Sequence, residues 1–342
     1  MHTRIRKGVN MRNNSNASAF DLKETQIAIK SLKDYFEREL GNSLNLARVS
    51  APLFVRPQTG LNDNLNGVEK AVSFSIRHHH LDCEIVQSLA KWKRWALKRY
   101  NFGVYEGLYA DMNAIRPDEE LDELHSAYVD QWDWEKIIKK SDRSTDYLKA
   151  CVREIFEVFK RTETYINSVY PYILSKKLPD EITFVTTQEM EDEMPALSPR
   201  EREREYARKY KAIFIIGIGG ALKSGKPHDL RSPDYDDWSM NGDIIFWDPV
   251  RNDSIELSSM GVRVDEDALK KQLAICNAED RLKLPFHQAL MNKELPYTIG
   301  GGIGQSRLCM YFLEKHHIGE VQCSVWDEAD VQKFAHENLT IL

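Results

Sequence analysis

Cysteine is scarce in this chain, and so are the patterns that would give it a structural role. The 342 residues include five cysteines, which are widely separated and form no CxxC pair. An odd number of scattered cysteines indicates neither a disulfide framework nor a zinc site. The sequence therefore predicts reduced thiols and a cytoplasmic protein.

Two further absences exclude whole classes of partner. No apolar run approaches the ~20 residues that a membrane span needs, so we expect no membrane. The net charge is −6 and the isoelectric point is about 6.0. Because the chain has no overall basic field, we expect no nucleic-acid partner.

The remaining composition is that of an ordinary globular protein, with 42% hydrophobic and 29% charged residues. No internal repeat and no Pro/Ser-rich linker divides it, so we expect a single domain over residues 21–342. Residues 1–20 are polar and rich in Asn and Ser. They fit a targeting peptide or a disordered tail, and we favour the tail.

Hydrophobic periodicity divides the chain into helices and strands. Apolar residues recur at helical spacing in 22–40, with Gly41 as a stop, and helices are also predicted at 84–100 and 144–169. Strands are predicted in hairpin-like pairs at 104–116, 125–134, 181–187, 212–218, 244–247 and 255–264. This order favours an α+β fold, a mainly antiparallel sheet flanked by helices, over a doubly wound βαβ fold.

The most informative segment is Gly300–Arg307, GGGIGQSR. Its glycines predict a turn that can use positive φ and that lets a ligand lie against bare backbone. The apolar run that follows, 308–313, predicts a buried helix with Arg307 in its first turn. A guanidinium there can contact a base or a phosphate.

Two other patterns are weaker signals. Gly220–Lys226 fits the start of a P-loop, but Pro227 stands where the Mg²⁺-binding Ser or Thr should be, so we interpret it as a glycine-rich hairpin. The triplet His78–His80 has no second cluster at metal-ligand spacing, and we interpret it as a solvated loop.

Three features accompany the glycine-rich segment in a fixed order. A helix and a short extended run end near Pro52, Arg116 ends a strand three residues before Glu119, and Glu256 and Arg263 bracket a later strand. Under strict alternation, Glu256 faces the opposite side from Arg263. Together with the glycine-rich segment, this order resembles the three signature motifs of class II aminoacyl-tRNA synthetases.

Five longer strings make the resemblance closer. The chain resembles the aspartate–ammonia ligase family in QSLAKWKR (87–94), YVDQWDWE (128–135), SPDYDDWS (232–239), ELSSMGVR (256–263) and TIGGGIGQSR (298–307). The resemblance implies a class II synthetase-like catalytic domain without a tRNA-binding module, and a homodimer formed through the first motif. It implies synthesis of L-asparagine from L-aspartate, ATP and ammonia through β-aspartyl-AMP, with release of AMP and diphosphate.

The resemblance also implies a nucleotide site. Arg116 would stabilise the charge that develops at the α-phosphorus, and Arg307 would stack on adenine or contact the phosphates. Mg²⁺ needs hard oxygen ligands, for which Glu256 is the first candidate and Asp243 the second. The other nucleotide-binding positions are Glu119, Gly302 and Gly304.

For the amino-acid substrate, the resemblance implies acidic groups that bind its ammonium and donors that bind its carboxylates. The acidic candidates are Asp63, Asp133 and Asp236, with Asp237 as an alternative to Asp236, and the donors are Ser88, Lys93, Gln131, Ser259 and Arg263. Catalytic roles are expected for Arg116, Asp63, Lys93 and Asp133. Which carboxylate binds the ammonium and which accepts a proton from ammonia stays open.

Two rival functions remain at this point. One is a true aminoacyl-tRNA synthetase, which performs the same activation but transfers the acyl group to tRNA. The other is a catalytically silent relative that binds adenylate-like ligands and acts as a regulator. Free ammonia is the expected nitrogen donor, because no amidotransferase domain is recognisable; whether glutamine can replace it stays open.

Overall fold

The structure is a computed structural model that describes residues 20–342 except 64, 66–69 and 172. Its largest element is an eight-stranded sheet. The strands are, in order across the sheet, β1 (Leu46–Arg48), β5 (Gly107–Ile115), β6 (Tyr128–Ile137), β11 (Thr298–Gly304), β10 (Asp253–Arg263), β9 (Asp236–Asp248), β8 (Ala212–Ile216) and β7 (Thr183–Thr186). The two outermost pairs, β1–β5 and β8–β7, are parallel, and all the pairs between them are antiparallel. The predicted mainly antiparallel sheet is confirmed.

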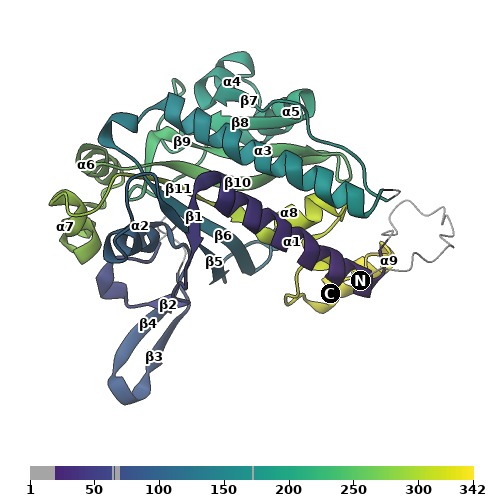
Figure 1. Ribbon diagram of the computed structural model, residues 1–342, viewed down its shortest axis with the longest axis horizontal. Helices are drawn as coiled ribbons and strands as arrows, with labels where there is room; N and C mark the ends of the chain where they lie inside the picture. Colours follow the sequence, from purple (N-terminus) through teal and green to yellow (C-terminus); the bar gives the residue numbers. More distant parts are fainter. Residues whose placement is uncertain (1–19, 64, 66–69, 172) are drawn as a thin grey trace.

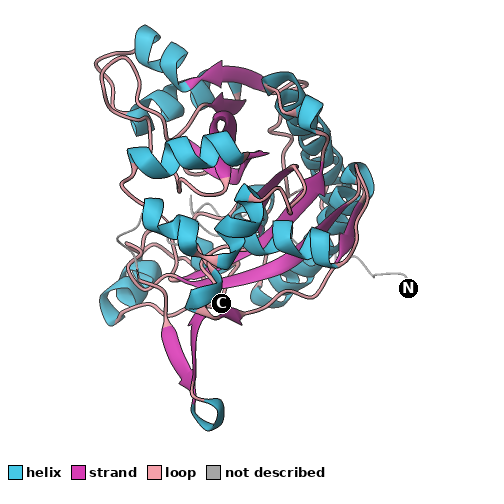
Figure 2. Cartoon of the chain, turned by 90° about the vertical axis from the view of Figure 1, so that its left-hand side faces the viewer, coloured by secondary structure: helices cyan, strands magenta, loops and turns pink. Residues whose placement is uncertain are grey.

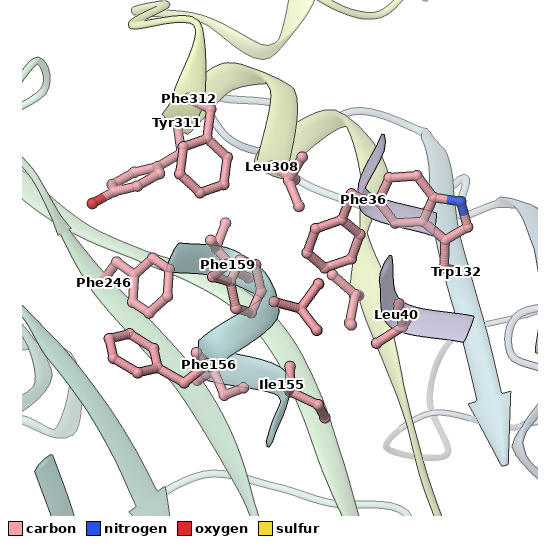
Figure 3. Close-up of a cluster of buried hydrophobic side chains, with 14 of the residues drawn as sticks. Phe36, Leu40, Trp132, Ile155, Phe156, Phe159, Phe246, Leu308, Tyr311 and Phe312 are labelled. Carbon is pink, nitrogen blue, oxygen red and sulfur yellow. The ribbon is translucent and has the colours of Figure 1, made fainter. Parts of the chain in front are cut away.

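One face of this sheet is covered by long helices. Figure 1 shows α1 (Leu22–Leu44) and α3 (Thr145–Val169) side by side across it, with α8 (Gln305–Phe312) nearby. Their apolar side chains form the main core, where Phe36 stacks on Trp132 and Phe159 packs edge-on against Phe246 (Figure 3). Helix α3 has the predicted bounds to within one residue. These helices leave the opposite face of β6 free for polar side chains.

Helix α1 is longer than the sequence predicted. It passes through Gly41 and ends at Leu44, with Asn45 in the left-handed conformation at φ 58°. The reason is that Leu40 and Leu44 continue the same buried stripe one turn further. One glycine near the end of an amphipathic helix costs less than burying these side chains stabilises.

The predicted helix at 84–100 is wrong over residues 84–89. Residues Leu81–Ile85 form strand β4, and helix α2 begins only at Ala90 and runs to Arg99. The backbone N–H of Leu89 donates to Asp133 Oδ2 at 3.1 Å, so a contact with β6 fixes the segment before the helix. Apolar side chains of α2 then pack on the face of β5 that carries Leu108 and Met112.

A small sheet of β2 (Phe54–Val55), β4 and β3 (Ser73–Ile76) lies at the end of the molecule. Its β3–β4 hairpin projects from the body in Figures 1 and 2. The triplet His78–His80 lies exposed at the hairpin tip, as the solvated-loop interpretation predicted.

Five further α-helices belong to the described part of the chain. They are α4 (Thr187–Glu193), α5 (Pro199–Tyr210), α6 (Glu266–Ile275), α7 (Pro285–Met291) and α9 (Glu328–His336). The Gly220–Lys226 segment is closed by an antiparallel bridge between Ala221 and Pro227, which confirms the hairpin interpretation. Among the described residues, no helix is long and apolar enough to cross a bilayer.

The predicted tail lies outside the described residues except for its last member. Phe20 is buried and packs edge-on against Tyr170 with the ring centroids 4.9 Å apart. Asp21 then caps α1 by accepting a hydrogen bond from the Glu24 N–H. The packed part of the chain therefore includes residue 20.

Candidate functional site

A cavity of about 460 Å³ opens on the face of the sheet opposite α1 and α3. Its walls come from β6, β10 and β11, from the start of α2, and from the loops around 116–126 and 229–235. Thirteen of the fifteen residues assigned to the site from sequence line it, while Lys93 and Asp243 do not. The lining residues are Asp63, Ser88, Arg116, Glu119, Gln131, Asp133, Asp236, Glu256, Ser259, Arg263, Gly302, Gly304 and Arg307.

Strand β6 supplies the floor of this cavity by simple alternation. Trp132 and Trp134 are buried in the helix-covered core, whereas Gln131 and Asp133 point to the other face and line the cavity. Side chains on successive residues of a strand point to opposite faces. The shared face predicted for Gln131 and Asp133 is therefore confirmed.

The three consecutive glycines do not form a turn. Gly300–Gly302 lie within strand β11, and neither they nor Gly304 have a positive φ. Glycine is required here for close approach: a Cβ would lie 2.1 Å from Glu135 Oε2 at Gly300, 2.5 Å from Met260 Cβ at Gly301 and 2.3 Å from Gln131 Oε1 at Gly302. Bare backbone at 301 and 302 then forms part of the cavity wall. The prediction of a buried helix after them, with Arg307 in its first turn, is confirmed by α8.

A β-bulge in β10 corrects the predicted facing of Glu256. The register with β9 shifts between Glu256 and Ser258, which adds one residue to this strand. Leu257 and Met260 consequently both face the main core, although they are three residues apart. Glu256, Ser259 and Arg263 all line the cavity, so strict alternation was wrong for Glu256.

Two cavity arginines are only loosely held. Arg116 has Glu119 as an ion-pair neighbour at 3.9 Å, and its buried Nε has no partner among the described residues. Arg307 donates to the Glu256 carbonyl oxygen at 3.2 Å and lies 3.7 Å from its carboxylate. Guanidiniums with spare donors in a cavity wall can bind an anionic ligand.

Lys93 lies beneath the cavity, and the three N–H donors of its ammonium group all have acceptors within the protein. It is fully buried and donates to Asp133 Oδ1 at 2.5 Å and to the carbonyl oxygens of Trp134 and Gly301. Burial lowers the pKa of Lys93, against the nearby carboxylates of Asp133 and Glu135. An ammonium has three donors, so this geometry uses Lys93 to hold Asp133 and β11.

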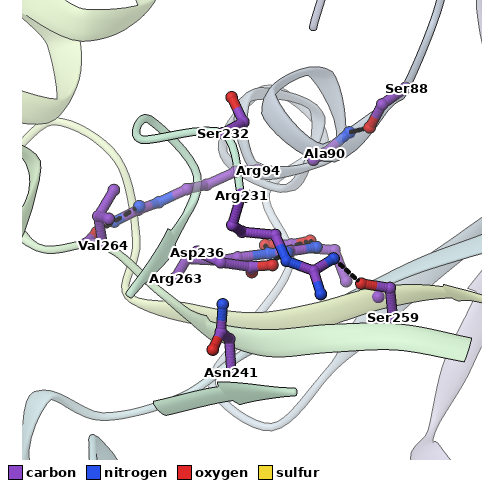
Figure 4. A network of polar contacts seen from close by, with 12 residues as sticks. Ser88, Ala90, Arg94, Arg231, Ser232, Asp236, Asn241, Ser259, Arg263 and Val264 are labelled. Carbon is purple, nitrogen blue, oxygen red and sulfur yellow. Dashed lines mark hydrogen bonds and ion pairs between the residues drawn. The ribbon is translucent and has the colours of Figure 1, made fainter. Parts of the chain in front are cut away.

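Arg231 and Arg263 are each fixed by carboxylates. Figure 4 shows Arg263 beside Asp236, and Arg231 in contact with Ser259. Arg263 is paired with Asp236 and, at 2.8 Å, with Glu135. Arg231 donates to both oxygens of Asp243 at 2.7 Å and to the Ser259 hydroxyl. Both oxygens of Asp243 are thus engaged, and burial raises the pKa of this carboxyl to about 6, with Arg231 opposing the shift.

Asp63 has a different environment from the other acidic groups. It is buried, its Oδ1 accepts from the Leu65 N–H at 3.0 Å, and its Oδ2 has no partner among the described residues. Burial raises the pKa of Asp63, while nearby Lys91 lowers it. An acceptor of this kind can bind a proton or a cationic group of a ligand.

The loop at 229–235 is anchored by Asp234. This fully buried carboxylate accepts from Lys91 at 3.0 Å, from His287 at 2.9 Å and from Arg281 at 3.2 Å. Burial opposes its ionisation, but these three groups hold the pKa of Asp234 well below its usual range. Arg231 belongs to this loop, so these contacts help to hold it at the cavity wall.

Comparison with known proteins identifies the family. A model of the aspartate–ammonia ligase family matches residues 23–338. The aspartate–ammonia ligase of Clostridium tetani is 60% identical over 323 residues, 94% of each chain, and that of Ruminiclostridium cellulolyticum is 60% identical over 325 residues, 95% of this chain and 96% of its own. The chain belongs to the aspartate–ammonia ligase family.

The fold of this family member is that of class II aminoacyl-tRNA synthetases. Asparaginyl-tRNA synthetase from Pyrococcus horikoshii, solved with asparaginyl-adenylate, is similar with a TM-score of 0.63 at 15% identity, covering 87% of this chain and 68% of that chain. Aspartyl-tRNA synthetase from Entamoeba histolytica gives 0.59 at 14% identity, covering 89% and 59%. The predicted fold class is confirmed.

Sequence reasoning missed two charged residues of the site, Arg231 in the cavity wall and Glu135 behind it. Glu135 is the last residue of the string at 128–135, and Arg231 directly precedes the string at 232–239. The sequence signal that could have identified both residues was their position within or next to a string that resembles the family. Their roles depend on partners on other strands, which spacing along the chain does not reveal.

Proposed function

We propose that this ligase makes L-asparagine and that its cavity binds L-aspartate and ATP together. The supporting observation is that one cavity joins the loosely held Arg116 and Arg307 to buried, oppositely charged side chains such as Asp236 and Arg263. The first kind of group suits a polyphosphate, and the second suits a small zwitterion. Ammonia is the proposed nitrogen donor.

The reaction proceeds in two steps. The side-chain carboxylate of aspartate attacks the α-phosphorus of ATP, which forms β-aspartyl-AMP and releases diphosphate. Ammonia then attacks the activated carbonyl carbon, AMP leaves with the bonding electrons, and the nitrogen loses a proton. Arg116 stabilises the charge that develops on the α-phosphate during the first step, because a preorganised cation needs no reorganisation as the reaction occurs.

The aspartate subsite lies over β6 and β10. Arg263 and Ser259 donate to substrate carboxylates, with Ser88 and Gln131 as further donors, and Asp133 or Asp236 accepts from the substrate ammonium. Asp63, whose free Oδ2 is buried, is the proposed acceptor for a proton from the incoming nitrogen. Lys93 acts from below by fixing Asp133.

The nucleotide subsite includes a place for Mg²⁺. No group of three or more metal-ligating side chains exists among the described residues, and Asp243 is engaged by Arg231. Of the two candidates, Glu256 is therefore the better ligand, because its carboxylate has only a long contact with Arg307, at 3.7 Å, among the described residues. It fits Mg²⁺, a metal that proteins hold through one or two carboxylates plus substrate phosphates. When bound, the ion neutralises phosphate charge. Arg307, Glu119 and the bare backbone of Gly302 and Gly304 position the nucleotide.

One assay tests the function. Purified enzyme is incubated with L-aspartate, MgATP and ammonium, and AMP and asparagine are measured against controls that lack aspartate or ammonium. Equal amounts of AMP and asparagine are expected. A parallel reaction contains total tRNA, and aspartylated tRNA without free asparagine there would support the aminoacyl-tRNA synthetase alternative. No turnover in either reaction would support the silent regulatory relative.

We further propose a cytoplasmic homodimer that acts without nucleic acid. The support is the helix α1 followed by β1 and an extended segment ending at Pro52, which corresponds to the dimer-forming first motif. A closed two-fold pair is the commonest form of oligomer. Sedimentation at micromolar concentration should give twice the chain mass, and a fully active monomer would contradict the proposal.

A further inference from the structure

Glu135 is a buried carboxylate that lies behind the cavity wall rather than in it. Its side chain is fully buried and it is absent from the cavity lining. It contacts Arg263 through three donor–acceptor pairs, Nε to both carboxylate oxygens at 3.1 Å and Nη2 to Oε2 at 2.8 Å. Burial works against its charge, but Arg263 and Lys93 hold the pKa of Glu135 below its usual value.

This ion pair crosses an intervening strand. Glu135 belongs to β6 and Arg263 to β10, and β11 lies between them. The crossing occurs at Gly300, where a Cβ would lie 2.1 Å from Glu135 Oε2 and 2.7 Å from Arg263 Nη2. A Cβ there would also lie 2.6 Å from the Trp134 carbonyl oxygen. Gly300 does not line the cavity, so its missing side chain serves the ion pair and the approach of β6, and not the ligand.

The contacts leave Arg263 with a defined set of free donors. A guanidinium has five N–H groups. Glu135 engages the one on Nε and one on Nη2, and Asp236 engages one on Nη1. Within the described residues, no further hydrogen bond engages the second N–H of Nη1 or of Nη2, and Arg263 lines the cavity. Guanidinium N–H groups without a protein partner can bind a carboxylate.

We propose that Glu135 is the positioning residue that orients Arg263 for the carboxylate of aspartate, and that Gly300 is glycine to make this contact possible. The proposal rests on the proposed function and deepens it. Glu135 fixes the plane of the guanidinium, so that the two free N–H groups point at the substrate and not at the wall. Without it, Arg263 is held at Asp236 alone and can turn its remaining donors away.

A charge-removing variant tests the proposal. Glu135→Gln keeps the shape of the side chain but cannot accept equally from Arg263. We expect the aspartate KM to rise at least tenfold, whereas the ATP KM changes less than twofold, because Arg116 and Arg307 are untouched. The matched control is Glu163→Gln, another buried carboxylate, which accepts from the Lys177 and Leu178 N–H groups far from the cavity; it should affect thermal stability and leave both KM values unchanged.

A second variant keeps the test decisive if Glu135→Gln does not fold. Gly300→Ala retains every charge and forces the Glu135–Arg263 pair apart. Its Cβ would also press on the Trp134 carbonyl oxygen at 2.6 Å, so thermal unfolding is measured beside the kinetics. The same rise in aspartate KM alone is expected of the folded variant. Glu135→Asp, which restores the charge with a shorter reach, should recover part of the aspartate KM. An unchanged aspartate KM, or equal rises for aspartate and ATP, would overturn the assignment. Failure of the wild-type enzyme to make asparagine would instead overturn the proposed function.

Discussion

The charged residues around the cavity differ in how fully their partners satisfy them. Arg116 and Arg307 are partly exposed and have spare donors, whereas Lys93 and Arg263 are buried and paired. Breaking a buried ion pair by removing one partner costs about 3–5 kcal/mol, while a loose surface pair contributes about 0–1 kcal/mol. Substitutions in the first group should therefore change activity alone, and those in the second should change stability as well.

Replacing Arg116 with Ala should impair adenylation and leave the fold intact. We expect turnover to fall by about 10²–10³-fold, as for the loss of a preorganised charge stabiliser. The free energy of unfolding should change by less than about 0.5 kcal/mol, because the Glu119 contact is long and partly exposed. Aspartate-dependent exchange between ATP and diphosphate measures the first effect and urea unfolding the second. Arg200→Ala, an exposed arginine 4.0 Å from Asp253, is the control; near-normal exchange in Arg116→Ala would disprove the assignment.

Replacing Asp234 with Asn should give a pH-dependent loss of stability. The folded-state pKa of Asp234 lies well below its unfolded value, so its ionised form stabilises the fold above about pH 4 and this contribution disappears as the pH falls further. At pH 7 the variant should lose about 3–5 kcal/mol. The difference from wild type should shrink toward about pH 3.

Urea unfolding at the two pH values checks this expectation. The exposed Asp180→Asn is the control for the chemical change, since this side chain is 95% accessible. A difference between wild type and Asp234→Asn that stays constant with pH would show that lost packing, and not lost charge, causes the effect.

At the scale of elements, β11 determines the shape of the site. Each of its first three glycines is required by a different neighbour, on β6 or on β10. Side chains at these positions would fill the space between the strand and the ligand cavity or would push the adjacent strands apart. The strand thus brings bare backbone next to charged groups from both sides, and α8 then places Arg307 at the cavity wall.

Alanine at two neighbouring glycines of β11 should separate stability from activity. At Gly301 a Cβ would lie 2.7 Å from the Ser259 carbonyl oxygen, which belongs to the backbone and cannot move cheaply. Gly301→Ala should therefore cost about 1–3 kcal/mol of unfolding free energy. At Gly302 the closest atom is the end of the Gln131 side chain, so Gly302→Ala should fold well and lose turnover. Thermal unfolding and turnover are measured for both; equal loss of stability in the two variants would contradict this explanation.

At the scale of the whole molecule, Phe20 is the first described residue and is packed. Deleting residues 1–18 should leave turnover and thermal midpoint unchanged, because the family match begins at residue 23 and polar termini rarely pack. Deleting residues 1–21 removes the buried Phe20 and the Asp21 cap of α1. That longer deletion should lose about 1.5–3 kcal/mol from the side chain and about 1 kcal/mol from the cap. A stability loss already present in the shorter deletion would show that earlier residues also pack.

The sequence by itself determined several of the elements and which residues share the cavity. Helical spacing in 144–169 and alternation in 125–134 predicted α3 and the cavity face of β6, because neighbours along the chain determine which side chains share a face. The family-like strings identified thirteen residues that the fold brings to one cavity. The α+β class also followed from the order of the elements.

Only the tertiary structure decided how those residues act. The bulge in β10 turned Glu256 toward the cavity, Lys93 was placed beneath it, and Gly300 proved to separate β6 and β10 at the Glu135–Arg263 pair. Glu135 and Arg263 are 128 positions apart in the chain. Contacts of this kind depend on strand order and register, which local spacing does not encode, because a shift of one residue would point each side chain to the other face.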